Sequence, residues 1–176
     1  VSASKSIISY YLDPRNFLNY DTSFMFVQQS YNSTQTADMV KTAVAGTFLA
    51  NGYDGNPNAY INDILEAARQ TGVSPLVLAA TIIVEQGPSG TSSLISGTYP
   101  NYQGYYNFFN IGASGVSSAD VIVSGLQTAK NNGWNTRRAA IIGGASSYAD
   151  GYISVGQDTF YYKNFNFVYD YPSRIW

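Results

Sequence analysis

The stretch Ser74-Pro75-Leu76-Val77-Leu78-Ala79-Ala80-Thr81-Ile82-Ile83-Val84-Glu85-Gln86-Gly87 decides the fold. Ser74 can cap a helix, and Pro75 suits the first helical position because it has no amide proton to leave unbonded. Gly87, followed by a proline, ends the helix. Almost every residue between these signals is apolar. A helix that is apolar all round is buried, so we expect the remaining helices to pack around this one.

Glu85 is the one carboxylate in the last turn of this helix. Burial and the negative end of the helix dipole both disfavour the charged form of a carboxyl group. A carboxyl group that stays protonated near neutral pH can act as a general acid. A simpler interpretation is that Glu85 only marks the point where the helix meets solvent, and the helix by itself does not decide between the two.

The composition favours a surface that meets neutral polar ligands. Charged residues make up 11% of the chain, against about 25% in typical soluble domains. Tyr is common, with 16 among 176 residues. Because a Tyr ring has an apolar face and a hydroxyl group, it suits the faces and hydroxyl edges of sugars. Tyr-rich packing in a secreted protein would give the same composition.

The missing residue types exclude several kinds of chemistry. The chain contains neither Cys nor His, so thiolate nucleophiles, Ser-His pairs and most transition-metal sites are excluded. We expect no metal and no cofactor. The net charge is −2 and the nine cationic residues are scattered, which argues against binding to nucleic acid. No apolar run approaches the ~20 residues of a membrane-spanning helix, so no membrane association is expected.

Periodicity and turn residues predict a mostly helical chain. Gly143-Gly144 inside one helix predicts close packing or a bend. Residues 23–31 have a weak strand pattern, and residues 87–117 are expected to form a loop or a small irregular β lobe over the Glu85 helix. The tail from residue 156 is aromatic and irregular. The expected helices cover residues 10–19, 34 or 36 to about 50, 58–71, 74–86, 117–129, 136 onward and 148–155.

The domain organisation is simple, because the chain has no internal repeat and no linker composition. We expect one domain over residues 1–176. The chain begins at Val1 without Met or a signal sequence, and we interpret it as a piece excised from a longer secreted protein. We expect a monomer.

Several motifs, in order along nearly the whole chain, resemble the catalytic core of family 73 glycoside hydrolases, the N-acetylglucosaminidases of bacterial autolysins. The helix ending in Val84-Glu85-Gln86-Gly87 is followed by Gly90-Thr91-Ser92-Ser93-Leu94 and Tyr106-Asn107-Phe108-Phe109-Asn110-Ile111-Gly112-Ala113. The resemblance extends to both ends and is most similar to clostridial autolysins. The outer motifs are Leu12 to Leu18, Gly133-Trp134, Ala140 to Ala145, Gly156 to Tyr161 and Phe165-Asn166.

The resemblance implies a mainly α, lysozyme-like (α+β) fold, in which a helical bundle and a small loop or β lobe form a cleft. It implies hydrolysis of the β-1,4 bond between N-acetylglucosamine and N-acetylmuramic acid in peptidoglycan, outside the cell at the bacterial cell wall. The family's catalytic Glu corresponds to Glu85 and its cleft Tyr to Tyr161. Its Asn-Leu-Phe-Gly-Ile stretch corresponds to Asn107 to Ile111, where this chain has Phe-Asn in place of Phe-Gly.

Further residues of the matching motifs are expected to contact the sugar. Phe108 and Trp134 are assigned to packing, because the usual role of a buried aromatic residue is in the core. For the polar residues in this set, bracing of a loop is the simpler alternative. The expected substrate-binding residues are Gln86, Tyr105, Tyr106, Asn107, Phe109, Asn110, Gln157 and Asp158.

The chain has no Asp or Glu between Glu85 and Asp120, although glycosidases usually pair two carboxyl groups. A second carboxylate would have to come from elsewhere, with Asp150 and Asp158 the candidates by position. Alternatively, the 2-acetamido group of the substrate attacks the anomeric carbon while Glu85 protonates the leaving oxygen. We prefer this scheme with one carboxylate.

Two other functions fit the same residues. Lytic transglycosylases share the fold and also use a single Glu. A glycan-binding module without catalytic activity would explain the aromatic loop as well. The identity of the reaction products separates the first from a hydrolase, and cleavage itself separates the second.

Overall fold

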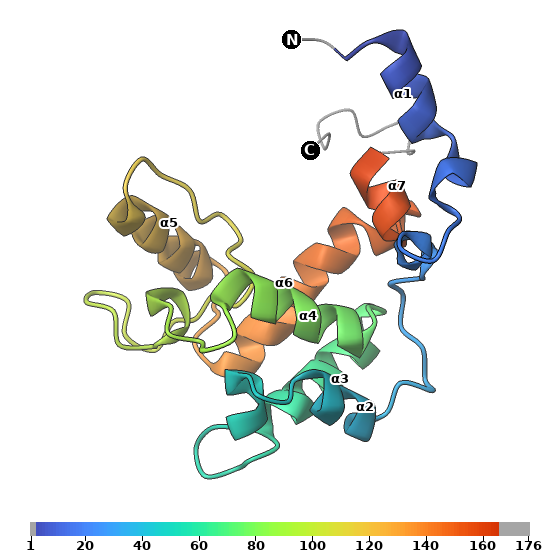
Figure 1. The fold of residues 1–176 in the computed structure, drawn as a ribbon. Coiled ribbons are helices and arrows are strands. Elements are labelled where there is room, and N and C mark those ends of the chain that lie inside the picture. Colours follow the sequence, from blue (N-terminus) through green and yellow to red (C-terminus); the bar gives the residue numbers. More distant parts are fainter. Residues whose placement is uncertain (1–2, 166–176) are drawn as a thin grey trace. The chain divides into compact units, whose positions relative to one another are not determined.

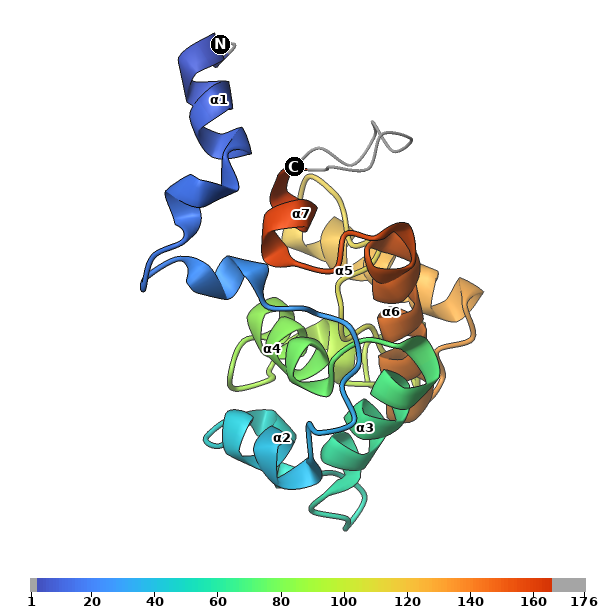
Figure 2. The same ribbon diagram turned by 90° about the vertical axis from the view of Figure 1, so that its right-hand side faces the viewer.

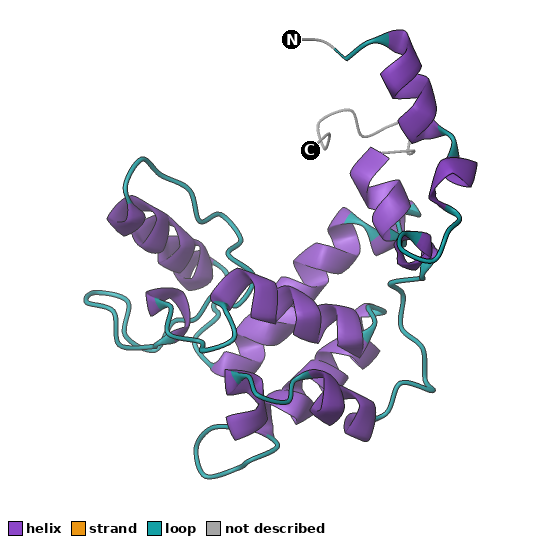
Figure 3. Ribbon diagram, in the orientation of Figure 1, coloured by secondary structure: helices purple, strands orange, loops and turns teal. Residues whose placement is uncertain are grey.

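The computed structural model describes residues 3–165 (Figure 1). These residues belong to two compact units, one formed by the chain up to Ser30 together with the chain from Asp150 on, the other by residues Tyr31–Ala149. The described residues form helices and loops without a strand (Figure 3), which confirms the mainly α fold. The single-domain organisation stays a prediction. Asn166 of the last motif and the aromatic residues that follow it lie outside the described residues.

The larger unit is built on three helices that contact one another, α2 (Ala37–Ala43), α3 (Ala59–Thr71) and α4 (Pro75–Gln86) (Figures 1 and 2). The apolar side chains of α3 recur at helical spacing, with Ile61, Ile64 and Ala68 buried. Gly72 ends α3 in the left-handed conformation, which costs glycine little. Since α4 begins three residues later, the two helices form a tight pair.

Helix α4 begins and ends as predicted, but it is not buried on all sides. The Ser74 hydroxyl accepts a hydrogen bond from the amide of Val77 at 3.3 Å. Leu78, Ala79, Ile82 and Gln86 form the buried face, whereas Val84 is 80% exposed. With 3.6 residues per turn, position 84 falls opposite the side that carries positions 82 and 86. The prediction of burial all round was therefore wrong, because apolar composition alone does not distinguish the two faces.

The segment between α4 and α5 (Ser118–Asn131) is an ordered loop with one short 3-10 helix, Ser93–Ile95. Leu94 and Ile95 are buried, and this turn contacts α5. Among the described residues the only β pairs are two isolated bridges outside this segment. Positive φ angles at several Gly residues, at Asn101 and at Asn110 interrupt any extended run. The loop alternative was therefore correct for these residues, and the β alternative was not.

Helix α6 (Arg137–Gly151) confirms close packing at Gly143-Gly144. A Cβ atom at Gly143 would lie 2.0 Å from Nε1 of Trp134, and one at Gly144 would lie 2.0 Å from the ring of Phe109. The glycine pair therefore creates room for two aromatic side chains. The helix runs on to Gly151 and is followed by a 3-10 helix at Ile153–Val155, where a separate helix from residue 148 was expected.

The smaller unit contains α1 (Lys5–Leu12), α7 (Phe160–Phe165) and 3-10 helices at Pro14–Phe17 and Ser23–Phe26. The first helix therefore begins earlier than predicted. The expected strand over residues 23–31 is a 3-10 turn followed by a single bridge from Gln28 to Thr159. The tail from residue 156 was expected to be irregular, but residues Phe160–Phe165 of it form α7, because aromatic packing outweighs a weak helical pattern.

None of the helices described is long and apolar enough to cross a membrane.

Candidate active site

Glu85 lies in the last turn of α4, next to the exposed Val84, and its own side chain is exposed. The expectation that burial would disfavour its charge is therefore wrong. Position 85 lies at the edge of the buried face, about 60° around the helix from Ile82 and about 100° from Gln86, where the side chain can reach solvent. The exposure makes the carboxylate accessible to a ligand, which a buried group would not be.

An amide network holds this carboxylate in place. Asn110 Nδ2 donates to Glu85 Oε2 at 2.8 Å and to the Glu85 backbone oxygen at 3.0 Å. Gln86 Nε2 donates to Asn110 Oδ1 at 2.7 Å and to the carbonyl oxygens of Asn107 and Phe108 at 3.2 and 3.0 Å. Gln86 is buried. The structure therefore places Gln86 and Asn110, both expected to bind substrate, beside Glu85, where the Gln86 side chain braces the loop.

Asn107 fixes the loop that carries Asn110. Its side-chain amide donates to the carbonyl oxygens of Ile111 and Gly125 at 2.8 and 2.9 Å, and its Oδ1 accepts from the amide of Ile111 at 3.1 Å. The side chain is fully buried. Asn107 thus joins the loop to α5, and a direct contact with substrate would require it to leave these partners.

The guanidinium group of Arg137 lies over two aromatic rings in the same unit. The Arg137 guanidinium carbon is 4.9 Å from the ring centroid of Tyr106 and 5.1 Å from that of Tyr53. Tyr106 and Tyr105 are half-buried. No polar or ring contact is recorded for the Tyr105 side chain within the described residues, so its ring is available to a ligand. These contacts could not be predicted from the sequence, because Tyr53 and Tyr106 lie 84 and 31 residues from Arg137 along the chain.

Buried Asp63 lies close to these rings. The Tyr53 hydroxyl donates a short hydrogen bond to the Asp63 carboxylate, and the nearest nitrogen of Arg138 lies 4.0 Å from it. Burial raises the pKa of Asp63, while the Tyr53 hydrogen bond and the charge of Arg138 act in the opposite direction. This acid ties α3 to the loop before it and to the start of α6.

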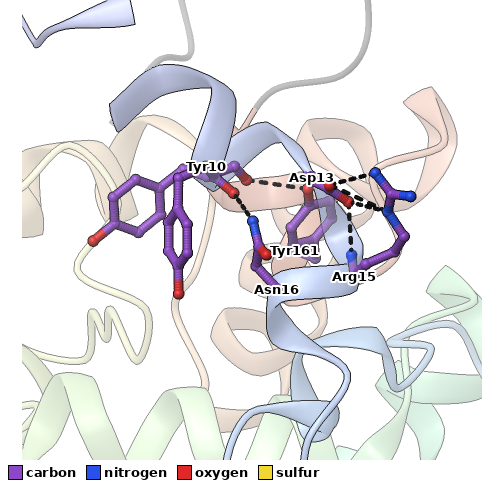
Figure 4. Close-up of polar contacts among 6 residues, drawn as sticks. Tyr10, Asp13, Arg15, Asn16 and Tyr161 are labelled. Carbon is purple, nitrogen blue, oxygen red and sulfur yellow. Dashed lines mark hydrogen bonds and ion pairs between the residues drawn. The ribbon is translucent and has the colours of Figure 1, made fainter. Parts of the chain in front are cut away.

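Two predicted site aromatics are buried in the core. Phe109 packs against Gly144 and is nearly inaccessible. Tyr161 is 1% exposed, its ring lies against Phe17 and Phe26, and its hydroxyl donates to the Tyr11 backbone oxygen at 3.1 Å (Figure 4). Burial also raises the pKa of Tyr161. We therefore assign both rings to packing, because a sugar would find little of either surface.

The remaining predicted residues lie in the smaller unit. Gln157 is buried, and its backbone N–H donates to the Tyr152 carbonyl oxygen at 2.9 Å. Asp158 is half-buried and its backbone oxygen accepts from the backbone N–H of Gln29 at 2.6 Å. Asp150 is exposed. Asp13, by contrast, caps the 3-10 helix Pro14–Phe17, with Oδ1 accepting from the backbone N–H of Arg15 at 3.1 Å (Figure 4).

Within residues 3–165, no group of three or more acidic side chains is arranged to hold a metal ion. In the same part of the chain, Asn110 is the one hydrogen-bond partner of the Glu85 carboxylate. The site that the structure assembles is therefore a single exposed carboxylate with a neutral amide support.

Known proteins similar to this chain include a glucosaminidase and bifunctional autolysins. A β-N-acetylglucosaminidase of Bacillus subtilis is 34% identical over 165 residues, which cover 91% of this chain and 18% of that protein. A bifunctional autolysin of Staphylococcus epidermidis is 36% identical over 109 residues, covering 57% of this chain and 8% of that protein. The chain thus spans less than a fifth of the length of these relatives. No protein-family model matches it.

Solved structures share the fold over most of the chain. Glucosaminidase B of S. aureus has a TM-score of 0.72 at 26% identity, covering 94% of this chain and 63% of that one. Autolysin E of S. aureus, solved as a catalytic mutant with the disaccharide NAG-NAM, has a TM-score of 0.57 at 24% identity, covering 94% and 67%. The fold is therefore that of a glucosaminidase domain of the lysozyme-like class.

The sequence motifs and these relatives lead to the same family. The chain belongs to the N-acetylglucosaminidase domains of glycoside hydrolase family 73.

Proposed function

We propose that the chain is the catalytic domain of a peptidoglycan hydrolase. It hydrolyses the β-1,4 bond between N-acetylglucosamine and N-acetylmuramic acid, with Glu85 as the general acid. The observation that carries the proposal is the exposed Glu85 carboxylate at the end of α4, held by Asn110, in a glucosaminidase fold. A structural neighbour that holds the disaccharide NAG-NAM supports the substrate class.

The chemistry requires one proton transfer in each direction. Protonated Glu85 gives its proton to the glycosidic oxygen as the C1–O bond breaks, and the leaving sugar departs as an alcohol. The carbonyl oxygen of the substrate's 2-acetamido group attacks C1 and forms a cyclic oxazolinium ion. Water then opens this ring, and the Glu85 carboxylate takes the proton from that water. Glu85 ends each cycle protonated, so no second carboxylate is needed.

A two-carboxylate scheme remains the alternative within the same function. Asp150 and Asp158 are the candidates, and both belong to the smaller unit. The scheme with one carboxylate is favoured by the neutral surroundings of Glu85, since the described residues supply no acidic partner to its side chain.

Further contacts with the glycan are proposed for exposed or half-exposed groups. Tyr105 offers a ring with no recorded partner, and Tyr106 offers an edge beside Arg137. We also propose a monomeric protein that acts outside the cell at the wall, as the autolysin relatives suggest. Gln157 and Asp158 stay predictions for the glycan site.

Product analysis tests this function. Purified peptidoglycan is digested with the protein, the products are reduced with borohydride and their ends are identified by mass spectrometry. We expect reduced N-acetylglucosamine at the new ends. A 1,6-anhydromuramyl end would identify a lytic transglycosylase instead, and binding without any cleavage would identify a glycan-binding module. Either result would overturn the proposal.

A further inference from the structure

The two oxygens of the Glu85 carboxylate are not equivalent. Oε2 accepts the hydrogen bond from Asn110 Nδ2 at 2.8 Å. Oε1 has no hydrogen-bond partner within the described part of the chain. A proton on Oε2 would compete with the amide donor, whereas a proton on Oε1 would not. The geometry therefore distinguishes the oxygen that anchors the side chain from the oxygen that can exchange a proton.

The amide of Asn110 can have only one orientation, because its neighbours determine it. Gln86 Nε2 lies among the carbonyl oxygens of Asn107 and Phe108, so this end of the Gln86 amide must be the donor. Since that donor also faces Asn110, the atom it meets there must be the oxygen Oδ1. The Asn110 nitrogen is left to face Glu85, which accepts from it.

The backbone favours Asn at this place. Asn110 has φ of 52°, a left-handed conformation that Gly adopts freely and Asn tolerates better than most residues. The family pattern has Gly here, and this chain has Asn. The substitution adds a hydrogen-bond donor toward Glu85 at little cost in backbone strain.

The charged side chains on the helices packed against α4 pair with groups other than Glu85. The Asn110 amide is therefore the polar group that acts on the Glu85 carboxylate locally. Helix α2 carries Asp38 and Lys41, which pair with each other at 3.8 Å. Helix α3 carries Asp63, Glu66 and Arg69, which are engaged with Tyr53, Arg138 and one another. The loop over residues 87–117 has no charged residue. Within residues 3–165, no ion pair includes Glu85.

We propose that Asn110 is a positioning residue for Glu85, oriented by Gln86, which commits Oε2 as an acceptor and leaves Oε1 to carry the transferable proton. The inference rests on the proposed function, because it assigns the acid role to Glu85. A donor to the ionised form favours that form.

Two substitutions separate this role from simple loop support. Asn110→Gly removes the donor and suits the left-handed backbone. Asn110→Asp keeps the shape but places a negative group against Glu85. Both variants should keep Glu85 protonated to higher pH. The high-pH limb of the kcat/KM profile should therefore shift to higher pH, further in Asn110→Asp than in Asn110→Gly. We expect kcat to fall on the order of ten- to a hundred-fold, with KM little changed.

Asn101→Gly is the matched control. Asn101 has φ of 69° and is exposed in the same loop, away from any recorded side-chain contact. The same replacement at position 101 should leave both kcat and the high-pH limb of the kcat/KM profile as in the wild type. A kcat loss in the Asn110 variants with an unmoved limb would overturn the inference, because loop support alone would give that result.

Carbon NMR tests the inference without relying on activity. The chain has two Glu residues, Glu66 and Glu85, so δ-13C-labelled Glu gives two carboxyl signals that Glu66→Gln assigns. The Glu85 titration midpoint should rise in Asn110→Gly and rise further in Asn110→Asp, while that of Glu66 stays in place. An unmoved Glu85 midpoint overturns the inference. Loss of the proposed function is recognised separately, as a wild-type protein that does not cleave peptidoglycan.

Discussion

At the scale of single residues, the site depends on amide geometry more than on charge. Gln86 and Asn107 are buried and hold the loop that presents Asn110 to Glu85. The sequence predicted that these residues belong to the site, because they lie in the matching motifs. It could not distinguish bracing from substrate contact, since both roles use the same amide groups and only the packed structure shows which groups face inward.

Gln86→Glu should destabilise the protein by about 3 kcal/mol, because it replaces a donor among three acceptors by a buried carboxyl group. Urea unfolding followed by circular dichroism measures the change. Gln103→Glu, at an exposed loop position, is the matched control and should cost little. Equal stability of the two variants would show that the amide bonds of Gln86 do not hold the loop.

Asp63 predicts a specific pH dependence of stability. Burial raises its pKa in the folded state above 3.8, so the unfolded chain ionises first as the pH increases. The contribution of Asp63 to stability is greatest below the unfolded pKa and is lost as the pH rises through the folded pKa. Asp63→Asn should therefore gain stability relative to the wild type between about pH 4 and neutral pH, measured by urea unfolding over this range.

Asp120→Asn provides the contrast for Asp63. A hydrogen bond from Ser117 lowers the pKa of Asp120, so its contribution is present above the unfolded pKa and lost as the pH falls through the folded pKa. This variant should lose stability relative to the wild type toward neutral pH. Trends of the same sign in the two variants would contradict the assigned surroundings of Asp63.

At the scale of elements, the helix signals were predictive and the apolar patterns were less so. The caps at Ser74 and Ser117 and the stop at Gly72 lie where the sequence placed them. The exposed face of α4 and the α7 helix were missed, because each depends on which neighbours cover the element. Local residues determine where a helix can begin, whereas tertiary packing determines which face it buries and whether a weak helix forms.

Gly144→Ala tests the packing of α6 against the loop. Alanine should favour the helix by about 1 kcal/mol, but its Cβ would lie 2.0 Å from the Phe109 ring. We expect the clash to dominate, with a net loss of about 1–3 kcal/mol in thermal unfolding and a lower kcat, because Phe109 precedes Asn110. Ser146→Ala on the exposed side of the same helix is the control. A stabilised Gly144→Ala variant would contradict this packing.

At the scale of the whole molecule, the fold and the family were predictable because the motifs occur in order over nearly the full chain. The missing second carboxylate was also visible in the sequence, since the loop after Glu85 has no acid. The amide support of Glu85 was not visible, because Asn110 lies 25 residues away along the chain. The proposed function depends on one carboxylate, Glu85, in a lysozyme-like glucosaminidase domain.

The most direct test compares the two Glu residues of the chain. Glu85→Gln and Glu66→Gln make the same chemical change, one at the site and one in an exposed ion pair with Arg69. Cleavage of purified peptidoglycan is measured for both, with circular dichroism to verify folding. We predict a loss of about 10²–10⁴-fold in kcat for Glu85→Gln and near wild-type activity for Glu66→Gln. Near wild-type activity in a folded Glu85→Gln protein would contradict the account.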